Sequence, residues 1–180
     1  MPFFIAAAAW LTLDASGTAA LCLLASFLHE GGHIAALLLC GRCPREVAVG
    51  VCGVRLVPDE CPLSYGRQVL VLLAGPAVNL LCGALFALCG GNAVAVAAHG
   101  LLGGFNLLPI EALDGGQCLR CLVAARWGGE RAERVTRGVS VAVLLPLATA
   151  GFFLLLHGGN ATLLAVSVYL SVRLFAHERI

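Results

Sequence analysis

The residues best suited to chemistry in this chain form the sequence His29-Glu30-Gly31-Gly32-His33. On a helix, positions i and i+4 share a face, so both imidazoles can bind one tetrahedral Zn²⁺. Glu30 lies one step round the helix, where its carboxylate can take a proton from a zinc-bound water and pass it to a leaving amine. The pattern therefore predicts a single zinc ion with a general base beside it.

The position of this motif favours a functional role. It begins about a dozen residues into the apolar run 18–40, which is roughly 16 Å along a helix. Ionisable residues are expensive near the bilayer centre and usually have a function and a partner there. This favours metal coordination over a chance match or a polar cluster that only stabilises helix packing. Gly31 and Gly32 leave one side of the helix bare, so another backbone can approach closely.

A catalytic zinc needs a third protein ligand and one open position. Asp114 is the expected ligand, because polar groups and broken backbone coincide around it at membrane depth. Gly115 and Gly116 directly after it are expected to let the chain turn tightly. Glu111 is the alternative ligand and is otherwise placed at the rim of the cavity.

Asn106 has two alternative roles. Its neutral amide can donate hydrogen bonds to the oxyanion of a tetrahedral intermediate, or it can cap a broken helix, and one side chain cannot easily do both. Pro109 follows and breaks the helix. We expect the backbone from Gly103 to Gly116 to be unwound, which at membrane depth requires burial in protein or a water-filled cavity.

The composition is that of a membrane protein. Hydrophobic residues make up 60% of the 180 residues and charged residues only 12%, while the net charge of +1 gives no basic field for nucleic acid. We expect one all-α polytopic membrane domain over residues 1–180, with about five to six transmembrane helices. The long apolar runs are residues 18–40, 68–89, 93–109, 139–156 and 161–176.

The positions of the basic residues predict the topology. All eleven are Arg, and if each run crosses once they fall on one side, in residues 42–67, 120–137 and 173–179. By the positive-inside rule that side is the cytoplasmic face of a bacterial cytoplasmic membrane. Residues 2–13 are too short for an ordinary span and lack a basic n-region, so we expect a retained, short or tilted first segment and not a cleaved signal peptide.

Alternating residues after the first long span predict a β-hairpin at the membrane surface. Val47, Val49 and Val51 alternate with small residues, and the prolines at 58 and 62 end the pattern. We expect this strand edge to bind substrate in an extended form. The alternative is a hairpin that only closes the loop.

Cysteine and the remaining histidines offer weaker signals. The pairs Cys40/Cys43 and Cys118/Cys121 could together hold a structural metal, but their wide separation favours packing roles. His99 lies in the third apolar run, where we expect a satisfied interior histidine and not a ligand.

Three motifs in order resemble the site-2 proteases, a family of intramembrane zinc metalloproteases. They are residues 29–33, Gly75-Pro76-Ala77-Val78-Asn79, and residues 106–115. The resemblance covers about residues 1–178 and is closest to the branch of stage IV sporulation protein FB, without a PDZ or CBS domain. It implies zinc ligands, a catalytic base and a matching Asn and Pro, namely His29, His33 and Asp114, Glu30, and Asn106 and Pro109.

The expected function is hydrolysis of a peptide bond in or near a substrate's membrane segment. The resemblance implies regulated intramembrane proteolysis of a membrane-associated or single-span protein, including a sigma-factor precursor, within the lipid bilayer. The alternatives are a proteolytically silent membrane chaperone and a zinc-binding or zinc-transport protein. Transport is disfavoured because the uncharged face offers no acidic or His path, and the intact Glu30 disfavours a silent protein.

Overall fold

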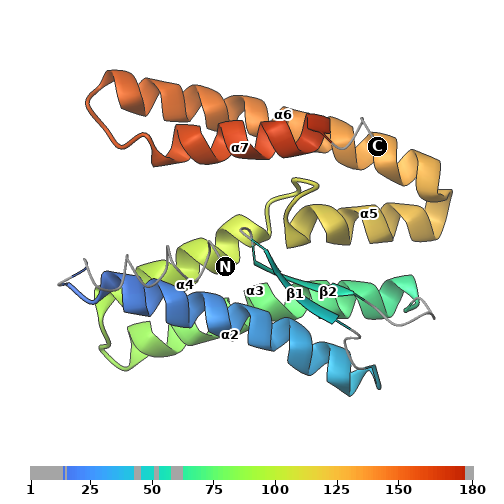
Figure 1. Cartoon of the computed structure of the whole chain (residues 1–180), viewed down its shortest axis with the longest axis horizontal. Coiled ribbons are helices and arrows are strands. Elements are labelled where there is room, and N and C mark those ends of the chain that lie inside the picture. Colours follow the sequence, from blue (N-terminus) through green and yellow to red (C-terminus); the bar gives the residue numbers. More distant parts are fainter. Residues whose placement is uncertain (1–13, 15, 43–45, 51–52, 58–62, 177–180) are drawn as a thin grey trace. The chain divides into compact units, whose positions relative to one another are not determined.

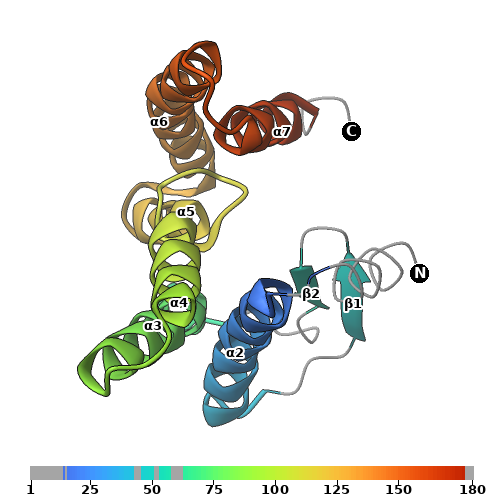
Figure 2. The same ribbon diagram turned by 90° about the vertical axis from the view of Figure 1, so that its left-hand side faces the viewer.

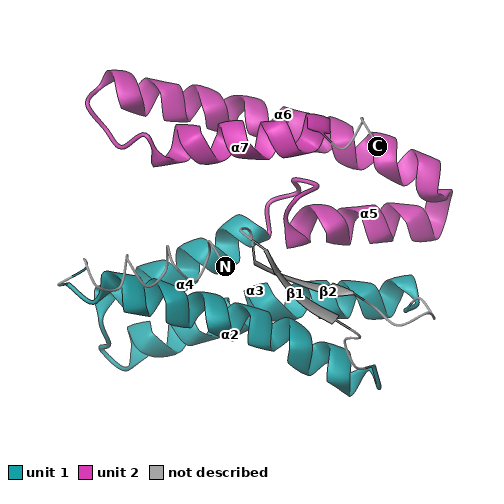
Figure 3. Ribbon diagram, in the orientation of Figure 1, with its two compact units in different colours: residues 1–106 teal, residues 107–180 magenta. Residues whose placement is uncertain are grey.

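The computed structural model describes residues 14, 16–42, 46–50, 53–57 and 63–176. The chain divides into two compact units, residues 1–106 and 107–180, which Figure 3 shows in different colours. The first unit holds the histidine motif and the second holds the Asp-Gly-Gly sequence.

The described residues of the first unit include three helices that pack together (Figure 1). They are α2 (Thr18–Leu39), α3 (Tyr65–Leu88) and α4 (Ala93–Asn106). Each packs against the other two, and Figure 2 shows the three helices close together. The polar residues that matter below lie where these helices meet.

A two-stranded antiparallel hairpin lies between α2 and α3 in the sequence. Strand β1 (Glu46–Gly50) pairs with β2 (Gly53–Val57), and the register runs from Glu46 opposite Val57 to Gly50 opposite Gly53. Its position at a membrane surface stays a prediction.

The second unit contains α5 (Asp114–Trp127), α6 (Gly129–Leu156) and α7 (Thr162–Ala176). Helix α6 packs against both of the others. The charged residues 129–137, which precede the apolar run 139–156, already belong to α6, because this helix begins at Gly129. Small side chains at four-residue spacing, Ala132, Thr136 and Ser140, are fully buried. Glu133 and Arg134 between the first two are exposed, so the segment is an amphipathic helix.

The same turn joins α3 to α4 and α6 to α7. In each, a glycine follows the helix in the left-handed conformation, Gly90 with φ 67° and Gly158 with φ 77°. The next glycine donates its N–H back to the helix, and the following Asn caps the next helix by accepting the N–H of Val94 or Thr162. A Gly-Gly-Asn sequence thus ends one helix and starts another.

Within the part of the chain that the structure describes, three helices are long and apolar enough to cross a membrane, namely α2, α3 and α6. Large apolar side chains point outward from them, such as Phe27 and Leu85, as expected of surfaces that face lipid. Helices α4 and α7 are apolar but shorter. These features are those of a membrane protein, and the count of five to six spans stays a prediction.

Candidate metal centre

Helix α2 brings the two histidines of the motif together. The Nε2 atoms of His29 and His33 lie 3.2 Å apart, and both side chains are at least nine-tenths buried. Their i and i+4 positions put them on one face of the helix, as the spacing predicts. Glu30, the next residue, is half-buried.

The second nitrogen of each ring is held by α3. The carbonyl oxygen of Val71 lies 2.8 Å from Nδ1 of His33, and the side-chain amide nitrogen of Asn79 lies 3.2 Å from Nδ1 of His29. Such outer bonds fix the orientation of metal-binding histidines in proteins. Both rings are therefore anchored at Nδ1 and direct Nε2 to the same place.

Two glycines make this close contact between α2 and α3 possible. A methyl group at Gly75 of α3 would overlap Nε2 of His33 and lie 2.9 Å from the carbonyl oxygen of His29. A methyl group at Gly32 of α2 would lie 2.8 Å from the carbonyl oxygen of Ala74. Gly31 differs, since a methyl group there would meet no described atom within 4 Å. Only one of the motif's two glycines is thus needed for the close approach.

Pro76 lies inside α3 and has no backbone N–H, so it cannot donate to the carbonyl of Leu72 one turn earlier. The Val71 carbonyl, which accepts the His33 N–H, precedes that carbonyl by one residue. The room for the His33 ring comes from Gly75, the residue before the proline.

The polar network continues from Asn79 into α4. The Asn79 side chain is fully buried, and its Oδ1 lies 3.1 Å from Nδ1 of His99. The His99 ring is also buried and stacks on Phe86, with ring centroids 5.7 Å apart. His99 is the satisfied interior histidine that we expected from the sequence.

The donor chemistry of this cluster suits zinc. Two neutral imidazoles with adjacent Nε2 atoms and hydrogen-bonded Nδ1 atoms are a common pair of zinc ligands. Calcium and magnesium prefer oxygen donors, which the pair does not offer. The residues of the first unit therefore fit the expected ion.

The expected third ligand belongs to the second unit. Asp114 is the first residue of α5 and is half-buried. Residues 107–113 before it lie outside any helix, and Leu113 donates its N–H to the carbonyl of Ile110. Glu111, the alternative ligand, donates its backbone N–H to the Ser140 hydroxyl of α6 at 2.9 Å.

The prediction that the backbone is unwound from Gly103 to Gly116 was wrong at both ends, because α4 continues to Asn106 and α5 already begins at Asp114. Neither Gly115 nor Gly116 has a positive φ, so tight turning is not their role. A methyl group at Gly115 would overlap the Leu107 carbonyl, and one at Gly116 would overlap the Ile110 carbonyl. The glycines let the preceding segment lie against the first turn of the helix.

Asn106 ends α4, and its side-chain amide donates to the carbonyl of Leu102 at 3.0 Å. This bond is the helix-capping alternative that the sequence left open. The amide carries a second N–H, which leaves its other role as a proposal.

The other predicted site residues are placed only in part. Val47 and Val49 lie in β1, and Val51 lies outside the described residues, as does Cys43. Cys118 and Cys121 are free and buried on α5, and burial raises the pKa of both thiols. This burial fits the packing role that we favoured for them.

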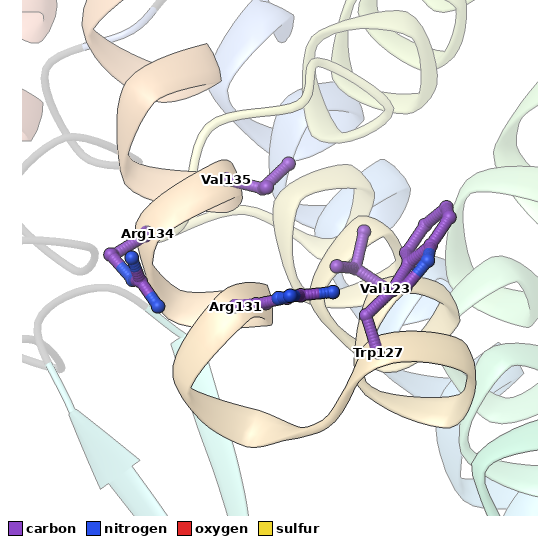
Figure 4. A pocket seen from close by; sticks show the side chains of 5 residues that line it. All are labelled: Val123, Trp127, Arg131, Arg134 and Val135. Carbon is purple, nitrogen blue, oxygen red and sulfur yellow. The ribbon is translucent and has the colours of Figure 1, made fainter.

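A shallow groove of about 320 Å³ lies between α5 and α6 (Figure 4). Its lining side chains are basic or apolar, with Arg131 extending toward Val123 in the view shown. It offers no His, Cys, Asp or Glu to a metal. Unlike the histidine pair, the groove therefore has no side chain suited to binding a metal ion.

Comparisons with known proteins support this architecture. No protein-family model matches the chain, and no curated protein matches it in sequence. A solved structure does match, that of a site-2 protease from Methanocaldococcus jannaschii. The fold is that of a site-2 protease. The TM-score is 0.71 at 20% sequence identity, over 99% of this chain and 87% of that one.

Proposed function

We propose that this chain is an intramembrane zinc metalloprotease that hydrolyses a peptide bond in or near a substrate's membrane segment. The observation that carries the proposal is the pair of buried histidines, with Nε2 atoms 3.2 Å apart and both Nδ1 atoms anchored by α3. The site-2 protease fold supports it.

Three residues would hold the metal: His29, His33 and Asp114. They offer two ring nitrogens and a carboxylate oxygen, a ligand set that leaves one position open on a tetrahedral ion. When bound, zinc supplies Lewis-acid chemistry, which lowers the pKa of water and polarises a carbonyl. Glu111 is the alternative acid, and its backbone is already bonded to Ser140.

Glu30 acts as the general base. It neighbours a metal ligand on α2 and is half-buried, so its carboxylate can take a proton from water and later give it to the leaving amine. The second N–H of the Asn106 amide donates to the developing oxyanion, while the first keeps its bond to Leu102.

The substrate is a membrane-associated or single-span protein, and the Arg-bearing loops face the cytoplasm of a bacterial cell. The resemblance to stage IV sporulation protein FB extends the proposal to regulated intramembrane proteolysis of a sigma-factor precursor. Peptide bonds in a transmembrane helix are already hydrogen-bonded, so the substrate must unwind before cleavage.

We further propose that the hairpin of β1 and β2 receives the unwound substrate as an added strand. Backbone groups left unpaired in lipid are costly, and a strand edge satisfies them. Ala48→Pro and Val49→Pro test this, because neighbouring residues of β1 direct their N–H groups to opposite sides. One variant should slow cleavage without loss of zinc. Unchanged cleavage in both would show that the hairpin only closes the loop.

The decisive experiment compares wild type with Glu30→Gln and His33→Ala. Each is purified for metal analysis and co-expressed with candidate single-span substrates. We expect about one zinc and cleavage in wild type, zinc without cleavage in Glu30→Gln, and neither in His33→Ala. His157→Ala is the control, since His157 is exposed and its ring bonds to its own helix at Phe153. Cleavage by Glu30→Gln would disprove the mechanism, and zinc without cleavage in wild type would indicate a silent protein.

A further inference from the structure

We propose that the groove between α5 and α6 binds the headgroup of an anionic phospholipid, with Arg131 and Arg134 contacting the phosphate and Trp127 lying against the glycerol and the start of the acyl chains. This is the groove of about 320 Å³ that Figure 4 shows. All of its lining residues belong to the second unit, and the inference does not depend on the proposed zinc site.

The lining residues come from one face of each helix. Val123 and Trp127 lie four residues apart on α5, and Val135 on α6 follows Arg131 by four residues and Arg134 by one. Helix α5 thus supplies an apolar surface, and α6 supplies two guanidinium groups beside it. A phospholipid presents the same two chemistries where its phosphate joins the glycerol and the acyl chains.

The exposure of these side chains is typical of a membrane interface. Val123 is buried, whereas Trp127 and Val135 expose 55% and 44% of their surface. Tryptophan rings are enriched at the level of the lipid headgroups, where one end of the indole is apolar and the other can donate a hydrogen bond. Arg126 adds a further positive charge, with its guanidinium carbon 6.0 Å from the centroid of the Trp127 ring.

The charges around the groove favour an anion. Residues 126–137 contain four Arg and two Glu, and Glu130 and Glu133 do not line the groove. Among the described residues, no carboxylate forms an ion pair with Arg131 or Arg134, and Nε of Arg134 donates to the backbone carbonyl of Glu130 at 3.5 Å. Guanidinium groups bind phosphate through two parallel hydrogen bonds. A zwitterionic headgroup would bring its own cation to this basic site, so an anionic lipid fits better.

The length of α6 places the groove at headgroup depth. Its 28 residues extend roughly 42 Å at about 1.5 Å per residue, whereas the hydrocarbon core is about 30 Å thick. About eight residues therefore lie outside the hydrocarbon when α6 crosses the membrane. The apolar run 139–156 fills the core, so the charged first turns, with Arg131 and Arg134, lie among the headgroups.

The size and lining of the groove favour a lipid over a soluble phosphate compound. Its volume lies at the lower end of the range for ligand sites, about 300–1,000 Å³, which suits a phosphate and glycerol but not two acyl chains. The chains must extend outside the groove, where lipid surrounds them. The apolar side chains of Val123, Trp127 and Val135 give a free phosphate no favourable contact.

Fluorescence quenching tests the proposal at the groove itself. The chain has two tryptophans, so Trp10→Phe leaves Trp127 as the only one. This protein is placed in phosphatidylcholine micelles and titrated with lipids whose acyl chains carry bromine, which quenches tryptophan on contact. We expect brominated phosphatidylglycerol to quench Trp127 at a fraction at least about fivefold lower than brominated phosphatidylcholine, since each Arg near the surface favours anionic lipid by about that factor.

Two double variants of this protein distinguish a local site from the overall charge. Arg131→Gln with Arg134→Gln should abolish the preference for phosphatidylglycerol. Arg120→Gln with Arg173→Gln removes the same charge from exposed positions on α5 and α7 that do not line the groove, and it should keep the preference. Equal loss in both double variants would overturn the proposal, because the attraction would then come from the overall charge.

Two further measurements can overturn the proposal. If soluble glycerol phosphate displaces phosphatidylglycerol from Trp127 at the same concentration as the lipid itself, the groove is a site for a soluble phosphate compound. Native mass spectrometry of the unsubstituted protein needs no variant to fold. We expect phosphatidylglycerol to remain bound after phosphatidylcholine has dissociated, and equal retention of the two lipids would show that the groove selects no headgroup.

Discussion

Two helical hairpins in this protein are built alike and used differently. The hairpins α3–α4 and α6–α7 share the Gly-Gly-Asn turn, and glycines bring their helices into close contact. In the first, the buried Asn79 bonds across to His99 on the facing helix. In the second, the buried Ser167 turns its hydroxyl back to Leu163 of its own helix. Small residues bring membrane helices together in both, but only the first hairpin carries a polar link to a candidate site.

The energy of such a link explains why its location is informative. Hydrogen bonds between membrane helices contribute only about 0.6 kcal/mol on average. A leucine pair would pack as stably and would avoid burying polar groups. The Asn79–His99 pair therefore indicates a requirement beyond helix packing, which the contact with His29 supplies.

The largest effect is expected from Gly75→Ala in the first hairpin. The added methyl group would overlap Nε2 of His33, so the ring must leave its position. We expect zinc binding to weaken by at least about tenfold, measured by metal analysis and chelator competition. Gly66→Ala on the same helix is the control, because a methyl group there meets no described atom within 4 Å. A full equivalent of tightly bound zinc in Gly75→Ala would contradict the site.

The second largest effect is a difference in stability between alanine substitutions at the two glycines of the histidine motif, Gly32 and Gly31. Gly32→Ala places a methyl group 2.8 Å from the Ala74 carbonyl and should destabilise the α2–α3 contact by about 1–3 kcal/mol. Gly31→Ala has room and should stabilise α2 by up to about 1 kcal/mol. Thermal unfolding in detergent measures both. Equal behaviour of the two variants would mean that α2 and α3 do not pack as described.

Gly151→Ala tests the second hairpin and sharpens the comparison. A methyl group there would lie 2.7 Å from the backbone nitrogen of Leu164, so α6 and α7 must separate. We expect a loss of about 1–3 kcal/mol in stability with zinc affinity unchanged. Gly138→Ala, also on α6 with no described atom within 4 Å of the added methyl group, is the control. A large loss of zinc affinity in Gly151→Ala would show that both hairpins serve the site.

The smallest effect concerns pH and lies outside both hairpins. Hydrogen bonds from the Ser16 hydroxyl and then from the Ala19 backbone N–H lower the pKa of Asp14, which precedes α2. Its stabilising effect is therefore complete above the ordinary pKa of 3.8 and is lost as the pH falls through the lower, folded value. Helices α4 and α7 begin with Asn caps, which do not titrate.

Asp14→Asn tests this effect in thermal unfolding between about pH 2 and pH 5. As the pH falls below about 4, the stability of the variant should decrease less than that of wild type. If stability falls equally with decreasing pH in the two proteins, Asp14 makes no measurable contribution to stability.

Local patterns in the sequence were sufficient to predict part of this site. The pairing of His29 with His33 follows from helix geometry, and the Gly-Gly-Asn sequences indicate both turns. The partners of the histidine rings could not be predicted, because Val71 and Asn79 lie about 40 to 50 residues away and meet them only through helix packing. Gly75 and Gly115 were recognisable as motif residues, but their physical role depends on which backbone lies opposite.

The start of α6 shows a different limit. Residues 128–137 are rich in charge and follow a glycine, which favours a loop when judged alone. The stripe of Ala132, Thr136 and Ser140 becomes a helix signal only when the apolar run after it is read as the same helix. The helical spacing of small residues continues from the charged segment into the apolar run. The high charge of residues 128–137 made this spacing hard to recognise in the sequence.

The proline in α3 has a mechanical consequence. His33 is tethered to Val71 on one side of Pro76, and His29 is tethered to Asn79 on the other side. Helices bend most readily at a proline. The two hydrogen bonds that orient the rings of His33 and His29 therefore start from opposite sides of the position where α3 would bend most readily.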